Sequence, residues 1–90
     1  MTPSWWWLSY ADAAGFRGGL VMPSPDPGHM GWLQAARDAR MRNLSPGGQV
    51  VGVPIKPSAL ERIAPNYRER LLNRAEADAI VAILDEEGPP

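Results

Sequence analysis

The chain has no cysteine and a single histidine, His29, among its 90 residues. The absence of cysteine excludes disulfides, thiolate metal sites and a cysteine nucleophile. With no second histidine and no His-Glu-x-x-His pattern, the sequence gives no basis for a zinc or calcium site. No Gly-x-Ser-x-Gly turn presents a serine nucleophile. We therefore expect a protein that is not an enzyme, with no catalytic residues, no cofactor and no metal.

Long apolar runs are also missing. No segment approaches the ~20 apolar residues of a membrane span, and the N-terminus lacks the basic and apolar regions of a signal peptide. The absence of cysteine is consistent with a reducing compartment. We expect a cytoplasmic protein that does not associate with a membrane.

Strong net charge is absent as well, since the formal net charge is −1. Such a balance gives no general attraction to nucleic acid, which is therefore not an expected partner. The charge is uneven along the chain, with a net +4 over residues 31–70 and −4 over residues 71–90. These two parts can attract each other or form separate sites, and a solvated mixed surface is the simpler alternative.

Ten prolines and nine glycines imply short elements joined by many turns. The patterns predict strands over 5–11, 16–22 and 49–55, helices over 28–42 and 73–86, a stiff link over 23–28 and a helical turn opened by a Ser58–Glu61 capping box. The expected fold class is α+β: a small β-β-α-β sheet, made of an antiparallel hairpin and a third strand, covered by the central helix and the C-terminal helix. The length fits a single small domain, 1–90, with frayed ends at 1–4 and 88–90.

Three consecutive tryptophans open the first predicted strand. Side chains alternate between the faces of a strand, so Trp5 and Trp7 face one way and Trp6 faces the other. Because a chain of this length has one small core, part of the cluster either lies beneath a helix on the second face or contacts a partner. Gly18 and Gly19 in the second strand predict a bulge, or a large side chain such as a tryptophan lying across the backbone.

Hydrophobic alternation and periodicity also assign the buried faces of the later elements. On the third strand, Val51, Val53 and Ile55 are expected to point inward. The expected inward stripe of the central helix is Trp32, Leu33, Ala36, Ala39, Arg40, Asn43 and Leu44, with Arg40 at its edge and Asn43 as a left-handed C-cap. The expected apolar face of the last helix is Ala77, Ile80, Val81, Ile83 and Leu84.

Four stretches together resemble a known group of proteins. They are Trp-Trp-Trp-Leu-Ser-Tyr-Ala-Asp over 5–12, Gly-Phe-Arg-Gly over 15–18, Leu-Ser-Pro-Gly-Gly-Gln-Val over 44–50 and Tyr-Arg-Glu-Arg-Leu-Leu-Asn-Arg-Ala-Glu-Ala over 67–77. In this combination, which spans most of the chain, the sequence is similar to small uncharacterised proteins of bacteria and their phages. No activity is assigned to that group, so the resemblance implies no site residues. It implies only a role related to phages or mobile elements.

Tryptophan and arginine are the residue types that most often anchor binding surfaces. They also suit a nucleotide, whose base stacks on an indole and whose phosphate pairs with a guanidinium group. The candidate contact residues for a partner or ligand are Trp5, Trp6, Trp7, Arg17, Arg37 and Arg40. A purely structural role, with the tryptophans in the core and the arginines in solvent, stays open.

We expect a non-catalytic protein-interaction module with a protein partner. In a phage or mobile element, it would inhibit or adapt a host defence protein. The alternative is a homo-oligomer that binds or sequesters a nucleotide-like anionic small molecule. A 90-residue subunit is too small to enclose such a ligand alone, so that site would lie between copies.

Overall fold

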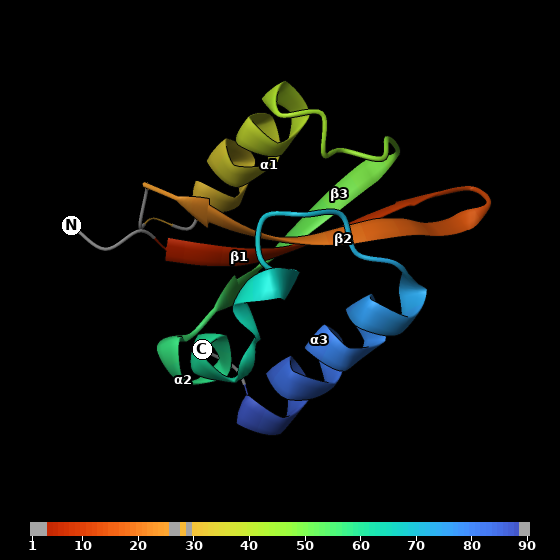
Figure 1. Ribbon diagram of the computed structural model, residues 1–90. Coiled ribbons are helices and arrows are strands. Elements are labelled where there is room, and N and C mark those ends of the chain that lie inside the picture. Colours follow the sequence, from red (N-terminus) through yellow and green to blue (C-terminus); the bar gives the residue numbers. More distant parts are fainter. Residues whose placement is uncertain (1–3, 26–27, 29, 89–90) are drawn as a thin grey trace.

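The structure is a computed structural model that describes residues 4–25, 28 and 30–88. One antiparallel sheet has the strand order β2-β1-β3, with β1 at Ser4–Asp12, β2 at Gly15–Ser24 and β3 at Gln49–Ile55. The helical elements are α1 (Gly31–Met41), α2 (Pro57–Arg62), the 3-10 turn η1 (Pro65–Tyr67) and α3 (Arg74–Glu87). Figure 1 shows α1 on one side of the sheet, with α2 and α3 on the other. The expected α+β fold class is confirmed.

β1 is the central strand and is buried on both faces. Trp6, Leu8 and Tyr10 pack on the α1 side, together with Leu20 and Met22 of β2 and two small residues of α1, Ala35 and Ala39. On the other side, Trp7 packs with Val21, with Ala59 of α2 and with Ala77 and Ile80 of α3. The alternation predicted for the tryptophans is therefore confirmed, and helices cover this strand on both faces.

Two glycines allow a tryptophan to lie directly on the sheet. A Cβ added to Gly19 would lie 2.2 Å from Cη2 of Trp7, and one added to Gly52 would lie 2.3 Å from Cβ of Trp32. Real Cβ atoms do not approach so closely, so each position has room only for glycine. The prediction that a tryptophan of the first strand covers the glycines of the second is confirmed at Gly19.

The hairpin also contains the other predicted feature, a bulge. Tyr10 pairs with Gly18 but Ala11 pairs with Phe16, which leaves Arg17 as the extra residue. A one-residue shift in a strand turns the following side chains to the opposite face. Phe16 therefore joins the cluster that contains Trp7, rather than the face expected from simple alternation.

The outer edge of β2 is covered by the segment that leads into α3. Leu72 and Gly19 form an antiparallel bridge, with N–H to O distances of 2.8 Å and 3.3 Å in the two directions. Earlier in the segment, the Glu69 amide donates to the Val21 carbonyl at 2.9 Å. Main-chain hydrogen-bonding groups at this edge of β2 are thus already paired within the protein.

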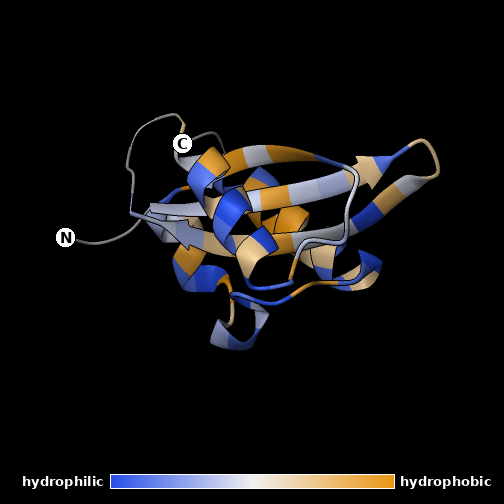
Figure 2. Ribbon diagram, turned by 90° about the horizontal axis from the view of Figure 1, so that it is seen from above, coloured by the Kyte–Doolittle hydropathy of each residue, from blue (hydrophilic) through white to orange (hydrophobic). Residues whose placement is uncertain are grey.

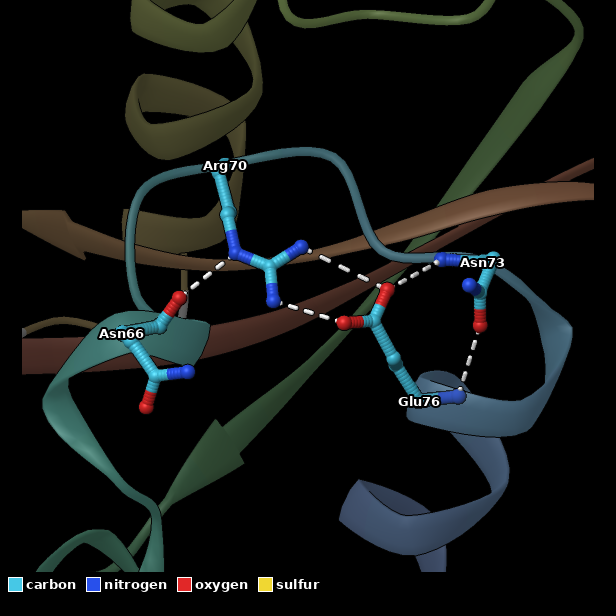
Figure 3. Close-up of polar contacts among 4 residues, drawn as sticks. All are labelled: Asn66, Arg70, Asn73 and Glu76. Atoms are coloured by element: carbon cyan, nitrogen blue, oxygen red, sulfur yellow. Dashed lines mark hydrogen bonds and ion pairs between the residues drawn. The ribbon is translucent and has the colours of Figure 1, made fainter.

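A small polar network holds that segment in place (Figure 3). Arg70 donates to the Asn66 carbonyl at 2.6 Å and to the Glu76 carboxylate at 2.6 Å. Asn73 and Glu76 then form the predicted capping box: the Asn73 side chain accepts from the Glu76 amide, and the Glu76 carboxylate accepts from the Asn73 amide. The start of α3 and the cover of β2 are therefore fixed together.

Several boundaries differ from the sequence predictions. Pro23 and Ser24 extend β2 instead of belonging to the link, because a proline at a strand end loses no essential donor. α1 begins at Gly31, and α2 begins one residue before the predicted cap, with Pro57 as its first residue and no side-chain cap. Asn43 has φ 59°, as predicted for a left-handed cap.

The predicted frayed ends are partly ordered. Ser4 belongs to β1, and Gly88 caps α3 with its amide bonded to the Leu84 carbonyl. The remainder of those two predictions, residues 1–3 and 89–90, lies outside the described residues, as does His29. No helix within the ranges that the structure describes combines the length and the apolar character needed to cross a membrane.

The inward assignment on β3 is wrong for two of its three residues. Ile55 is buried, but Val51 is 63% exposed and Val53 is 39% exposed. Both valines lie on the Trp7 side of the sheet, where α3 packs against β2 and leaves β3 uncovered. For the same reason Val81 of α3, expected on the apolar face, is 40% exposed.

Candidate functional site

Two arginines of α1 line a pocket of about 280 Å³ between that helix and the sheet. Tyr10 of β1 and Val50 of β3 form its inner wall, since they lie side by side in the sheet. The pocket, which we name the arginine groove, is lined by Tyr10, Leu33, Ala36, Arg37, Arg40, Ser45, Gly48 and Val50. Three elements and the turn after α1 therefore meet at this site.

No carboxylate among the described residues neutralises the guanidinium groups of Arg37 and Arg40. The chain has eight arginines. Five of the others form ion pairs: Arg17 with Asp12, Arg42 with Glu69, Arg62 with Glu86 and Glu87, Arg70 with Glu76, and Arg74 with Asp78. The sixth, Arg68, donates to the carbonyls of Leu60 and Ile63. Among the residues that the structure describes, Arg37 and Arg40 alone of the eight contact no such acceptor, so both can receive an anion.

The side chain of Tyr10 lies beneath these arginines and is only 3% exposed. Its hydroxyl has no hydrogen-bond partner among the described residues. Burial raises the pKa of Tyr10, and the neighbouring Ser45 hydroxyl and the Arg40 charge offset part of that rise. Ser45 is near, but the pair falls outside hydrogen-bond geometry. The groove therefore has a neutral hydroxyl donor at its base, which is costly to leave unpaired.

Arg17 lies beside the groove and supports its turn. Its guanidinium group donates to the Asp12 carboxylate at 2.8 Å and to the Pro46 carbonyl at 3.1 Å. The ion pair lowers the pKa of Asp12, as does the hydrogen bond from the Ala14 amide. Arg17 thus links the hairpin to the turn that carries Ser45, with its charge already balanced.

The three tryptophans lie mainly in the core. Trp6 and Trp7 are each 5% exposed. Trp5 is partly buried, and the Arg68 guanidinium group lies 5.3 Å from the centre of its ring. These positions leave little indole surface for a partner, so the arginines rather than the tryptophans present the candidate surface.

The structure thus brings together two of the six predicted contact residues, Arg37 and Arg40. Neither Tyr10 nor Ser45 was among the predicted contact residues. Helical spacing does place Arg37 and Arg40 three residues apart on one side of α1. Nothing in the sequence shows that the turn at 45–48 returns to the same place.

The chemistry available in the groove is that of binding. An arginine guanidinium group donates hydrogen bonds and does not lose its proton in proteins, so it cannot act as a base. Of the residues that the structure places around the groove, none is a carboxylate or a histidine. Within the described ranges, no group of three or more histidine, cysteine, aspartate or glutamate residues could hold a metal ion. Two cations and the Ser45 hydroxyl instead provide donors for an anionic group, while the Tyr10 hydroxyl is buried in the wall.

Comparison with known proteins gives no relative for this chain: no protein-family model, curated protein or solved structure matches it.

Proposed function

We propose that the protein is a non-catalytic interaction module that binds a protein partner through the arginine groove. The observation that supports this most directly is the contrast among its arginines. Six are engaged within the fold, whereas Arg37 and Arg40 have no ion-pair partner among the described residues and line a concave site. A charge-assisted hydrogen bond to an arginine is about twice as strong as a neutral one.

The walls of the groove also suit a protein surface. Leu33 is 40% exposed beside the two arginines, and Val50 is partly exposed on the strand below. Interfaces commonly combine an arginine or tyrosine anchor with apolar surroundings that exclude water. The suggestion that the partner is a host defence protein, inhibited or adapted by a phage or mobile-element factor, rests on the sequence resemblance alone.

The proposal is tested by comparing capture of host proteins by three immobilised forms of this protein. They are the wild type, the double variant Arg37→Ala with Arg40→Ala, and the control Arg74→Ala, whose side chain is 72% exposed on the opposite helix. We expect one captured protein to be retained by the wild type and the control. Its affinity for the double variant should fall at least tenfold, about 1.4 kcal/mol.

Thermal unfolding of the three forms serves as the stability control, because exposed arginines contribute little to folding. Equal capture by all three forms would show that the groove is not the contact surface. Addition of salt should also weaken the interaction, because the ion pairs formed at a partly exposed groove are screened.

A second candidate, a nucleotide-like small anion, is favoured by the same cationic pocket. At about 280 Å³ the groove is at the lower limit for a drug-sized ligand, so a whole nucleotide would need a second wall from another copy. Titration with a panel of mononucleotides, followed by calorimetry and sedimentation velocity, tests this. Binding coupled to dimer formation supports the second candidate, and no heat of binding excludes it.

A further inference from the structure

The outer edge of β3 is not paired by any part of the chain that the structure describes. β3 bonds to β1 on one side only, and no described residue makes a main-chain hydrogen bond to its other side. The opposite edge of the sheet, on β2, is covered by the bridge to Leu72. Unpaired N–H and C=O groups on an edge strand form a template for another extended chain.

β3 has only part of the usual protection of an edge strand. Gln49–Ile55 contains no charged residue, whereas natural edge strands are commonly protected by lysine or other charges. Pro54 has no N–H to donate, which confines the usable template to Gln49–Val53. Figure 2, viewed from the α1 side, shows β3 as an outer strand with mostly hydrophobic colouring.

Hollows flank the exposed valines on the side away from α1. One, of about 450 Å³, is lined by Ser9, Ala11, Asp12, Ala13, Gly48, Gln49 and Val51. The other, of about 310 Å³, is lined by Val53, Pro54, Lys56, Ala59, Leu84, Asp85 and Gly88. Apolar side chains of an added strand would find space beside Val51 and Val53 here.

The arginine groove lies at the same strand but on the opposite face. Val50 lines the groove together with Tyr10 and the two arginines, while Val51 faces the other side of the sheet. Successive side chains of an added strand alternate between these two faces. Side chains on one face would reach Arg37 and Arg40, and those between them would lie next to Val51.

We infer that the partner docks as an extended segment alongside Gln49–Val53, with acidic side chains at alternate positions entering the arginine groove and apolar side chains between them covering Val51 and Val53. This inference rests on the proposed function, since it uses the same two arginines. Main-chain hydrogen bonds would supply affinity, and the two different faces would supply specificity. The unpaired cations select an acidic segment over a neutral or basic one.

The test uses a synthetic peptide that alternates glutamate and valine, titrated into the isotope-labelled protein and followed by NMR. We expect shifts in the amides of Gln49–Val53 and in the side chains of Arg37 and Arg40. A peptide of the same composition, with its glutamates and valines in separate blocks, should bind at least tenfold more weakly because it cannot match both faces.

Backbone methylation tests strand pairing directly. In an added strand only every second amide faces β3. We compare a peptide methylated at all valine amides with a peptide methylated at all glutamate amides. One of the two should bind at least tenfold more weakly, and the other should bind as the unmethylated peptide does. Equal binding of both methylated peptides would overturn strand addition, and so would the absence of binding by the alternating peptide.

Protein variants separate this inference from the proposed function. Val51→Lys should weaken the alternating peptide at least tenfold, whereas the matched control Val81→Lys, at an exposed valine of α3, should not. The double arginine variant could lose binding while Val51→Lys and methylation have no effect. That result would support the arginine groove as the binding site and reject strand addition. If both sets of changes had no effect, both proposals would fail.

A second copy of this chain is the competing occupant of the edge. Sedimentation velocity of the protein alone distinguishes it: a monomer supports an external segment. A dimer that Val51→Lys dissociates would overturn the inference, because the edge would then be filled by the protein itself.

Discussion

The two outer strands of the sheet have similar apolar sequences and very different surroundings. β2 is buried on both faces, and its edge is closed by the bridge between Gly19 and Leu72. β3 has two exposed valines and an edge that no described residue pairs. The difference arises from the part of the chain that comes after β3, since segment 68–72 and α3 pack against β2 and not beside the β3 edge. A strand's own sequence therefore does not determine whether its edge is closed.

The charged residues follow the same division. Arg70 and Glu76 hold the cover of β2 in place, and their ion pair is one of several on that side of the molecule. Arg37 and Arg40, next to β3, contact no carboxylate within the described part of the chain. The two arginines without an ion-pair partner among the described residues thus lie beside the open edge. The predictions below test this contrast, from the largest expected effect to the smallest.

The largest effect is expected from truncating the indole that packs against β2. Trp7→Ala should lower the free energy of unfolding by about 3–5 kcal/mol, because a large buried side chain leaves a cavity. Val51→Ala, on the same sheet face but 63% exposed, should change it by no more than about 0.5 kcal/mol. Urea unfolding measures both, and equal losses would contradict the contrast between β2 and β3.

A methyl group at the point where Trp7 crosses β2 should be the next most damaging change. Gly19→Ala places a Cβ against the indole ring and should cost about 1–3 kcal/mol by overpacking. In a Trp7→Leu background the same change should cost less, because the smaller side chain gives the Cβ room. Identical costs in the two backgrounds, measured as a double-mutant cycle, would rule out the clash as the cause.

Loss of the α3 cap should weaken the cover of β2 by a smaller amount. Asn73→Ala removes the side chain that accepts from the Glu76 amide and should cost about 1 kcal/mol. Asn66→Ala is the matched control, since Asn66 contributes only its main-chain carbonyl to the network in Figure 3. Chemical unfolding of both variants gives the comparison, and a larger loss at Asn66 would contradict it.

The smallest effect is a pH dependence. The Arg70 guanidinium group and the Asn73 amide lower the pKa of Glu76 below its ordinary value of 4.5. A carboxylate with a lowered pKa adds stability above its unfolded pKa, and this stability is lost as pH falls through the folded pKa. Between about pH 7 and pH 3, Glu76→Gln should therefore lose less stability than the wild type.

The urea midpoint at each pH measures this difference. The Ser58 hydroxyl and then Arg62 lower the pKa of Glu87, and Arg17 lowers the pKa of Asp12, so the wild-type protein weakens in acid for several reasons. Only the difference in pH dependence between the wild type and Glu76→Gln measures the contribution of Glu76 to stability. A variant that loses as much stability as the wild type would show that the pair with Arg70 does not contribute.

Local rules predicted much of the fold. The alternation of Trp6 and Trp7, the bounds of β3 and the capping box at Asn73 each follow from residues close together in sequence. These are the features for which backbone geometry and short-range hydrogen bonds decide the outcome. The bulge was also indicated by the paired glycines, but not its effect on Phe16.

What the sequence could not supply was the arrangement of elements over the sheet. Val51 and Val53 alternate as a buried strand should, and their exposure depends on where α3 packs. In the same way, no local pattern distinguishes Arg40, which pairs with no described carboxylate, from Arg42, which pairs with Glu69. The candidate site was therefore predicted as a set of residue types, and only the tertiary structure selects its members.

The central position of β1 has a consequence for the order of folding. Its hairpin with β2 joins neighbouring segments, whereas its ladder with β3 joins residues 38 to 50 positions apart, from Ala11 with Gln49 to Trp5 with Ile55. Closing that longer loop costs more chain entropy, so the hairpin can form first. As the chain leaves the ribosome, Trp7 emerges in the first described strand, whereas the α3 residues that cover that face, Ala77 and Ile80, emerge much later. The apolar side chains at the centre of the finished core therefore stay exposed in the nascent protein until α3 packs against them.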